Sequence, residues 1–252
     1  MVKSLYTAGA GMMLQLVRQD AAANNLANCN TVGYKKDTVV SAAFPGMLMS
    51  RMGEKGLAAG RNYEIIGPVS TGASMEGVFT NYTQGNMQKT DNPLDAAIMG
   101  EGYFVMDTPQ GERFSRDGQM EINDQNILVN KQGIPYLDQN DEPIVLASEP
   151  AISKDGSVYV NNELIAKLKI VEFADAGVLR KEGGNLINAP QNYTVMEQPQ
   201  IRQGFVENSN VSTVSEMVNL ISIVRLYESM QKVVQAEDEA LETAITQVGS
   251  VN

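Results

Sequence analysis

The chain contains no histidine and no tryptophan, and it has a single cysteine. Histidine is the commonest general base and the commonest metal ligand, so its absence argues against an enzyme and against a metal protein. Cys29 alone excludes an internal disulfide framework and a cysteine-rich metal site. No apolar run is long enough to span a bilayer, and the first residues do not resemble a signal peptide. We therefore expect a soluble chain without a cofactor or metal, and any export must follow another route.

Basic charge is also scarce. The 252 residues carry a formal net charge of −11, and no cluster of lysine or arginine reverses this locally. Duplex DNA and anionic membranes attract positively charged surfaces. The composition thus argues against duplex nucleic acid and anionic membrane as main partners, and we expect neither nucleic-acid binding nor membrane insertion.

Apolar residues recur at helical spacing at both ends of the chain. Over Leu5 to Ala27 they form a stripe of Leu5, Met12, Leu16, Ala23 and Leu26. Thr213 and Glu216 match a capping box, and they are followed by a heptad-like seam of Leu220, Ile223, Tyr227, Met230, Val234, Leu241, Ala244 and Val248. No glycine or proline interrupts residues 213–248, so we expect a helix roughly 54 Å long. A helix of this length is expected to pair with other helices.

The middle of the chain has the pattern of β structure. Short strand-like runs, separated by turn signals such as Asp117-Gly118 and Asp155-Gly156, cover Glu101–Met106, Gln125–Asn130, Ser157–Asn161 and Leu168–Phe173. From Pro45 to Thr80 the periodicity is weak, and we expect extended or irregular backbone there.

The sequence thus predicts an α+β fold, in which long N- and C-terminal α-helices pair as a coiled-coil-like inner domain and the centre is a mainly antiparallel β domain. The expected parts are residues 1–34 (N-terminal helix and Asn-rich cap, inner domain), 35–80 (irregular or extended arm), 81–200 (β domain) and 201–252 (C-terminal connector and long helix, inner domain).

Three local motifs resemble chemical sites but have simpler interpretations. The GxG of "GEGYF" (Gly100–Phe104) precedes β-forming residues rather than a helix, which indicates a tight start of a strand. "DQNDEP" (Asp138–Pro143) lacks the glycine of a calcium loop and predicts a polar hairpin turn. Cys29 has no histidine to activate it and is interpreted as a small side chain at a helix end. No catalytic, cofactor-binding or metal-binding residue is predicted.

The stretch "ANNLANCNTVGYKK" (Ala23–Lys36) places four asparagines where the first helix must end. One interpretation is a C-terminal cap with Gly33 at positive φ. The other is that some of the amides bridge neighbouring subunits. The second interpretation expects Asn25→Ala or Asn28→Ala to leave the melting of the monomer nearly unchanged while motility is lost.

This stretch is similar to the N-terminal signature of the bacterial flagellar rod and hook family. "TQGNMQKTDNPLDAAIMGEGYF" (Thr83–Phe104) and "GERFSRDGQM" (Gly111–Met120) resemble its central motifs, and "QGFVENSNVSTVSEMVNLISIVRLYES" (Gln203–Ser229) resembles its C-terminal signature. The chain length suits a rod protein. "SLYTAGAGM" and "AFPGMLMSR" look nearer the proximal member, but the choice between proximal and distal rod stays open.

The resemblance implies a structural subunit of the basal-body rod, which polymerises through its terminal helices into a hollow drive shaft transmitting torque from motor to hook. Implied partners are copies of itself, other flagellar rod and hook subunits, and the flagellar type III export apparatus. The implied location is the rod spanning the periplasm. Implied subunit-interface candidates are Asn24, Asn25, Leu26, Asn28, Asn30, Gly33, Tyr34, Ser209, Asn210, Val211, Glu216, Met217, Val218, Arg225, Tyr227 and Glu228. The alternative is a secreted β-domain binding module of adhesin type with helical ends.

Overall fold

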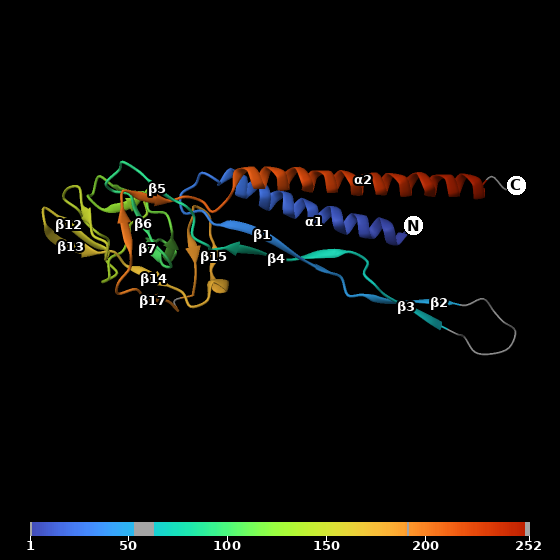
Figure 1. Cartoon of the computed structure of the whole chain (residues 1–252), viewed down its shortest axis with the longest axis horizontal. Coiled ribbons are helices and arrows are strands. Elements are labelled where there is room, and N and C mark those ends of the chain that lie inside the picture. The colour runs from blue at the N-terminus through green and yellow to red at the C-terminus, as the bar shows by residue number, and fades with distance from the viewer. Residues whose placement is uncertain (1, 53–62, 191, 250–252) are drawn as a thin grey trace. The chain divides into compact units, whose positions relative to one another are not determined.

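The computed structural model describes residues 2–52, 63–190 and 192–249 (Figure 1). The chain divides into two compact units: unit 1 is residues 1–26, 37–80 and 213–252, and unit 2 is residues 27–36 and 81–212. The chain therefore passes from one unit to the other after Leu26, Lys36, Thr80 and Ser212. Terminal helices and a central antiparallel β region confirm the α+β prediction.

The described part of unit 1 consists of two helices and two pairs of strands (Figure 1). Its elements are α1 (Val2–Ala27), β1 (Lys36–Ala43), β2 (Met47–Met52), β3 (Tyr63–Val69), β4 (Ala73–Asn81) and α2 (Thr213–Gly249). β1 pairs with β4, and β2 pairs antiparallel with β3 so that Met47 lies opposite Val69.

The segment from Pro45 to Thr80 is more regular than the sequence suggested. Its described residues form the strands β2, β3 and most of β4, while residues 53–62 lie outside the described residues. The described side chains of these strands are exposed or half-buried, with no buried position among them. Apolar and polar residues alternate along a strand when one of its faces is buried. These strands have no buried face, so the sequence carries no alternation from which they could be predicted.

The buried face of α1 differs from the apolar stripe that the sequence suggested. The buried side chains of the helix are Ala8, Leu14, Gln15, Ala22 and Asn25. At 3.6 residues per turn, Leu5, Met12 and Leu16 of the predicted stripe lie about 120° around the helix from that face. Leu5 is 36% exposed and Leu16 is 46% exposed. Much of the predicted packing stripe is thus a surface of the chain.

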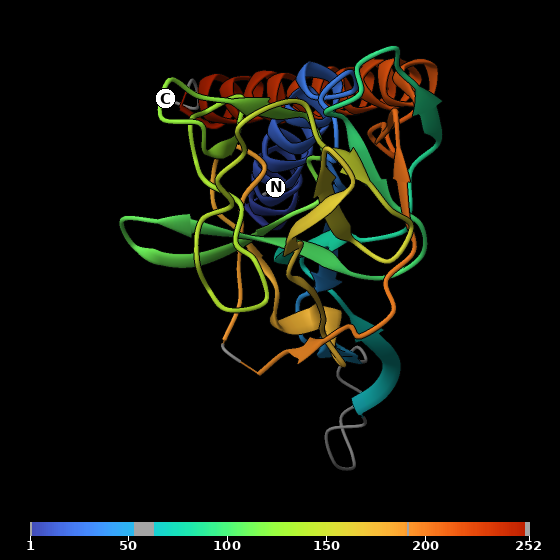
Figure 2. The ribbon, with the colours of Figure 1, turned by 90° about the vertical axis from the view of Figure 1, so that its left-hand side faces the viewer.

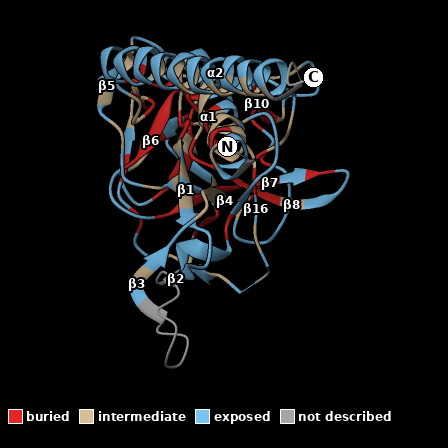
Figure 3. Cartoon of the chain, turned by 90° about the vertical axis from the view of Figure 1, so that its right-hand side faces the viewer, coloured by how far each residue is buried: buried red, intermediate tan, exposed pale blue. Residues whose placement is uncertain are grey.

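The predicted seam of α2 faces its own unit over residues 220–234, whereas the side chain of Val248 lies outside the described residues. Ile223 is buried, and Leu220, Tyr227, Met230 and Val234 are half-buried. Met230 lies against α1, because a Cβ atom added at Gly11 would be 2.8 Å from its sulfur. The remaining surface of α2 is mostly exposed (Figure 3).

Unit 2 is built from short antiparallel strands (Figure 2). The largest sheet has the order β15 (Arg180–Lys181), β16 (Ile187–Asn188), β8 (Gly111–Ser115), β7 (Tyr103–Thr108), β14 (Ile170–Glu172), β17 (Thr194–Val195). A second sheet has the order β11 (Ala151–Ile152), β12 (Ser157–Val160), β13 (Glu163–Lys167). The strand pairs are β9 (Met120–Ile122) with β10 (Leu128–Asn130), β6 (Ala96–Ile98) with β18 (Ile201–Gln203), and β5 (Met87–Lys89) with β19 (Phe205–Glu207). A short 3-10 helix covers Ala176–Val178.

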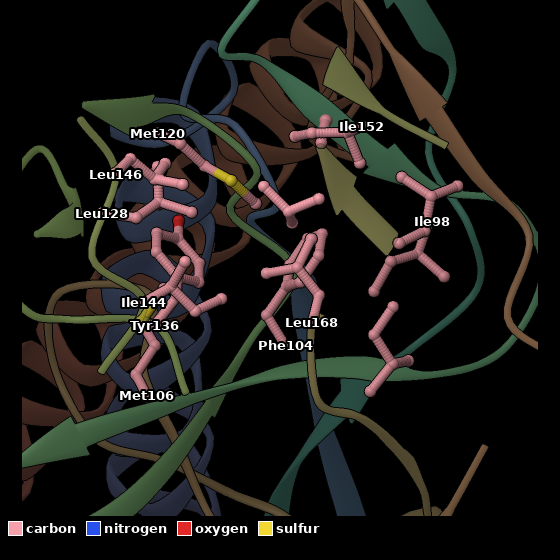
Figure 4. Close-up of a cluster of buried hydrophobic side chains, with 14 of the residues drawn as sticks. Ile98, Phe104, Met106, Met120, Leu128, Tyr136, Ile144, Leu146, Ile152 and Leu168 are labelled. Carbon is pink, nitrogen blue, oxygen red and sulfur yellow. The ribbon is translucent and has the colours of Figure 1, made fainter. Parts of the chain in front are cut away.

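The main core of unit 2 lies among these sheets. Phe104 and Tyr136 meet edge to face at its centre with ring centroids 5.7 Å apart, and Met106, Leu128 and Leu168 surround them (Figure 4). Each of the four strand-like runs of the sequence overlaps an observed strand, namely β7, β10, β12 and β14. The prediction of these strands is confirmed.

Candidate assembly site

The Asn25 side chain joins the end of α1 to the start of β1 within unit 1. Its Nδ2 donates to the carbonyl oxygen of Asp37 at 2.8 Å, and its Oδ1 accepts from the backbone N–H of Asp37 at 2.9 Å. The Asp37 carboxylate accepts in turn from the Thr80 hydroxyl at 2.7 Å, where β4 ends. Asn25 is only 1% exposed. The Asn25 amide therefore bonds both backbone groups of Asp37, as a neighbouring strand would. This contact within the monomer revises the expectation that Asn25→Ala leaves the melting of the monomer nearly unchanged.

We expect Asn25→Ala to destabilise unit 1 of the monomer by about 1–3 kcal/mol, since both backbone groups of Asp37 lose a buried partner. Amide hydrogen exchange at Asp37 and thermal unfolding of the monomer measure this. Asn30 is exposed, and Asn30→Ala is the matched control, with an expected change within about 0.5 kcal/mol. Equal melting of both variants would contradict the role given to Asn25.

The other asparagines of the stretch have different surroundings. Asn28 belongs to the turn after α1, where its carbonyl oxygen accepts from the N–H of Thr31 at 3.2 Å and its Oδ1 accepts from the Thr31 hydroxyl at 3.3 Å. Asn24 and Asn30 are exposed, and Leu26 is half-buried. The four amides thus do not form one group.

Gly33 has positive φ, as predicted, but for another reason. Its φ is 72°, whereas α1 already ends at Ala27, so Gly33 does not cap the helix. Its N–H donates to the Glu207 carbonyl oxygen at 2.7 Å. A Cβ atom here would lie 2.6 Å from the backbone carbon of Arg116. Glycine is required because two chain segments of unit 2 meet at this point.

A buried charge cluster lies beside Gly33 and was not identified from the sequence. Glu207 is 1% exposed, and its carboxylate contacts Lys35 Nζ at 2.5 Å and Arg116 Nη1 at 3.1 Å. Burial lowers the pKa of Lys35, and the neighbouring Glu207 carboxylate opposes that shift. One buried carboxylate thus holds two buried cations.

Backbone groups also bond to the charged side chains of this cluster. Lys35 Nζ donates to the Thr83 carbonyl oxygen at 2.9 Å, and the Gly85 N–H donates to Glu207 Oε1 at 2.8 Å. Arg116 Nη2 donates to the Gly100 carbonyl oxygen at 2.8 Å. Nothing in the sequence pairs these residues, because Lys35 and Glu207 stand 172 residues apart.

Tyr34 and Asn210 fix the same region of unit 2. Lys181 Nζ lies 4.0 Å from the centroid of the Tyr34 ring and also donates to the Lys35 carbonyl oxygen. Asn210 Oδ1 accepts from the Lys36 N–H at 2.7 Å, and its Nδ2 donates to the Asn81 carbonyl oxygen at 2.9 Å. The N-terminal and C-terminal signatures thus meet around residues 33–36.

The remaining candidates divide between local contacts and open surface. Ser209 Oγ accepts from the N–H of half-buried Val211 at 3.2 Å. Glu216 is buried and accepts from Asn219 Nδ2 at 3.4 Å. On α2 the half-buried candidate is Tyr227 and the exposed ones are Met217, Val218, Arg225 and Glu228.

The structure agrees with the simpler interpretations of the segments Gly100–Phe104 and Asp138–Pro143, which were a tight start of a strand and a polar turn. Gly100 and Gly102 have positive φ immediately before β7, as expected for a tight start of a strand. Asp138 Oδ1 accepts from the N–H groups of Asn140 and Glu142 in a polar turn. Among the described residues, the acidic side chains and Cys29 form no group suited to a metal. In that same part of the chain, no helix has the length and apolarity to cross a membrane.

Three family models of flagellar proteins match successive parts of the chain. Residues 5–35 match the model described as "Flagella basal body rod protein", residues 97–160 match "Flagellar hook protein FlgE/F/G D1 domain", and residues 202–247 match "Flagellar basal body rod FlgEFG protein C-terminal".

Relatives that align over nearly the whole chain are also flagellar proteins. The chain is 30% identical to the flagellar hook-basal body complex protein FlhO of Bacillus subtilis and 32% identical to the flagellar basal-body rod protein FlgF of Caulobacter vibrioides, with 100% of each chain covered. It is also 32% identical to the flagellar basal-body rod protein FlgG of Borreliella burgdorferi, over 96% of this chain and 97% of the relative. The chain therefore belongs to the flagellar basal-body rod protein family.

Proposed function

We propose that this chain polymerises through its terminal helices, with copies of itself and with other rod and hook subunits, into a hollow drive shaft that transmits torque from motor to hook. Family membership makes it a structural rod subunit of the basal body rather than an enzyme. We extend the proposal to a coiled-coil-like inner domain, to export by the flagellar type III apparatus without a cleavable signal peptide, and to a rod that spans the periplasm.

The observation that carries this proposal is the apolar surface of the two helices. On α1, Tyr6 is 72% exposed and Met13 is 71% exposed; on α2, Val214 is 73% exposed. Large apolar side chains gathered on a surface indicate contact with other chains. The subunit-interface candidates that the family resemblance implies remain part of this proposal, and among them Met217 and Val218 are exposed on α2.

An adhesin-type binding module is the less favoured function. In such a protein the β surface binds and the helical ends are dispensable. The family matches instead include both ends of the chain, over residues 5–35 and 202–247.

Removal of both helices separates these functions. We expect a fragment of residues 27–212 to be a β-rich monomer that does not polymerise at any accessible concentration, because the apolar helix surfaces are gone. The fragment begins at Ala27 because Gly33, Tyr34 and Lys35 are buried in unit 2. Light scattering measures assembly, and circular dichroism verifies the β structure. Filaments of this fragment would instead favour binding through the β domain.

A further inference from the structure

An apolar groove of about 810 Å³ opens on unit 1. Its walls come from the first half of α1, from Phe44 and Met47, and from Tyr227 of α2. Among the described residues that line it, Lys3 is the only charged one. Leu5, Met12 and Leu16, three of the five residues of the predicted apolar stripe of α1, line this groove. The stripe that α1 does not bury in its own unit is thus concentrated in one concave surface.

A second apolar surface lies on the outer side of α2. Val214, Met217, Val218 and Ile221 follow the i, i+3, i+4, i+7 spacing of one helix face, and they are between 47% and 73% exposed. At 3.6 residues per turn, this face lies about 150° around the helix from the seam that contains Ile223. We define these four residues as the outer stripe. The helix therefore has one apolar face toward its own unit and another directed away from it.

We propose that the groove of one copy receives the outer stripe of α2 from a second copy. The proposal rests on the function above, and it assigns the surfaces that meet. Groove and stripe are different surfaces of the same chain, so their contact is heterologous and leaves a free groove at one end and a free stripe at the other. Such a contact propagates, as growth of a rod requires, whereas a stripe-to-stripe contact would close into a dimer.

Charge favours the same pairing. The chain has a net charge of −11, so two copies repel each other at long range. A contact made from the outer stripe and the described lining of the groove includes Lys3 and no carboxylate. This pairing therefore joins two negatively charged chains through surfaces that bring no carboxylates together.

Disulfide cross-linking in basal bodies tests the contact. The variants are Met13→Cys in the lining of the groove, Val218→Cys on the outer stripe, and the two together, each combined with Cys29→Ser to remove the native thiol. Met13 and Val218 are 71% and 59% exposed, so these changes should spare the fold of the monomer. After mild oxidation we expect monomers from each single variant and a ladder of dimers and larger multimers from the double variant.

Other gel patterns would overturn the proposal. Dimers from Val218→Cys alone would show a stripe-to-stripe contact, and a cross-link from either variant to a different rod protein would show a different occupant. A double variant that swims but gives no ladder would refute the groove and keep the rod function. Absence of the protein from basal bodies would instead refute the function itself.

A charge exchange provides a second measurement. Met13→Lys and Val218→Glu each place an unpaired charge in an apolar contact and should lower swimming by about tenfold or more. The two changes in one chain place opposite charges across each contact, so swimming should recover. Unchanged melting of each monomer is the control. Failure of the double variant to swim better than either single variant contradicts the pairing.

Discussion

Glu207→Gln is expected to lower the free energy of unfolding of unit 2 by about 3–5 kcal/mol, the cost of breaking a buried ion pair from one side. The change keeps the volume of the side chain but removes the charge that balances Lys35 and Arg116, which are 2% and 6% exposed. Two buried cations then remain without a carboxylate. Urea unfolding followed by the near-UV signal of the buried tyrosines of unit 2 measures the loss.

Glu182→Gln is the matched control for this change. Glu182 also pairs with an arginine, Arg113, but its side chain is 50% exposed. Water therefore replaces the lost partner, and we expect a much smaller change in the free energy of unfolding than for Glu207→Gln. An unfolding midpoint of Glu207→Gln close to that of Glu182→Gln would show that the buried cluster does not hold unit 2 together.

Gly118→Ala is expected to lower the free energy of unfolding of unit 2 by about 3–5 kcal/mol. Changes of this size occur when an added group has no room in a packed interior. The added Cβ would lie 1.7 Å from the carbonyl oxygen of Ala96. The obstacle is backbone, and it belongs to a strand whose residues Ala96, Ala97 and Ile98 are all buried. To remove this clash, the two backbone segments must move apart. That movement breaks the hydrogen bond from the Ala96 N–H to the Gly118 carbonyl oxygen.

The control for Gly118 is another loop glycine of the same unit. A Cβ added at Gly183 meets no atom within 4 Å, and its φ lies outside the left-handed region. We expect Gly183→Ala to change stability by no more than about 0.5 kcal/mol. Calorimetry on the two variants compares them directly, and a Gly118→Ala protein that melts with the parent would refute the steric argument.

Local patterns in the sequence predicted local structure well. The end of α1 at Ala27, the start of α2 at Thr213 and the four strands of the β domain all depend on spacing and turn signals within a few residues. The positive φ of Gly33 was also predicted, although its cause is the backbone of Arg116 rather than a helix end.

Features that depend on distant contacts could not be predicted in this way. Lys35, Arg116 and Glu207 read as ordinary surface charges because no short pattern marks a residue whose partner is far along the chain. The apolar stripe of α1 was visible, but periodicity alone does not say whether a stripe faces its own fold or another molecule. Asn25 was named as an interface candidate, whereas its buried amide pairs with Asp37 in its own unit.

The arrangement of unit 2 also determines when it is able to fold. Gly33 and Lys35 both bond to Glu207 of β19, and β5 and β6 pair with β19 and β18. These early segments therefore depend on strands that come late in the chain. Closing such long loops costs chain entropy before any contact repays it, which slows folding of topologies with high contact order. A chain that has been synthesised only as far as Pro199 lacks both β18 and β19. We therefore expect β5 and β6 to stay without their partner strands until β18 and β19 are available.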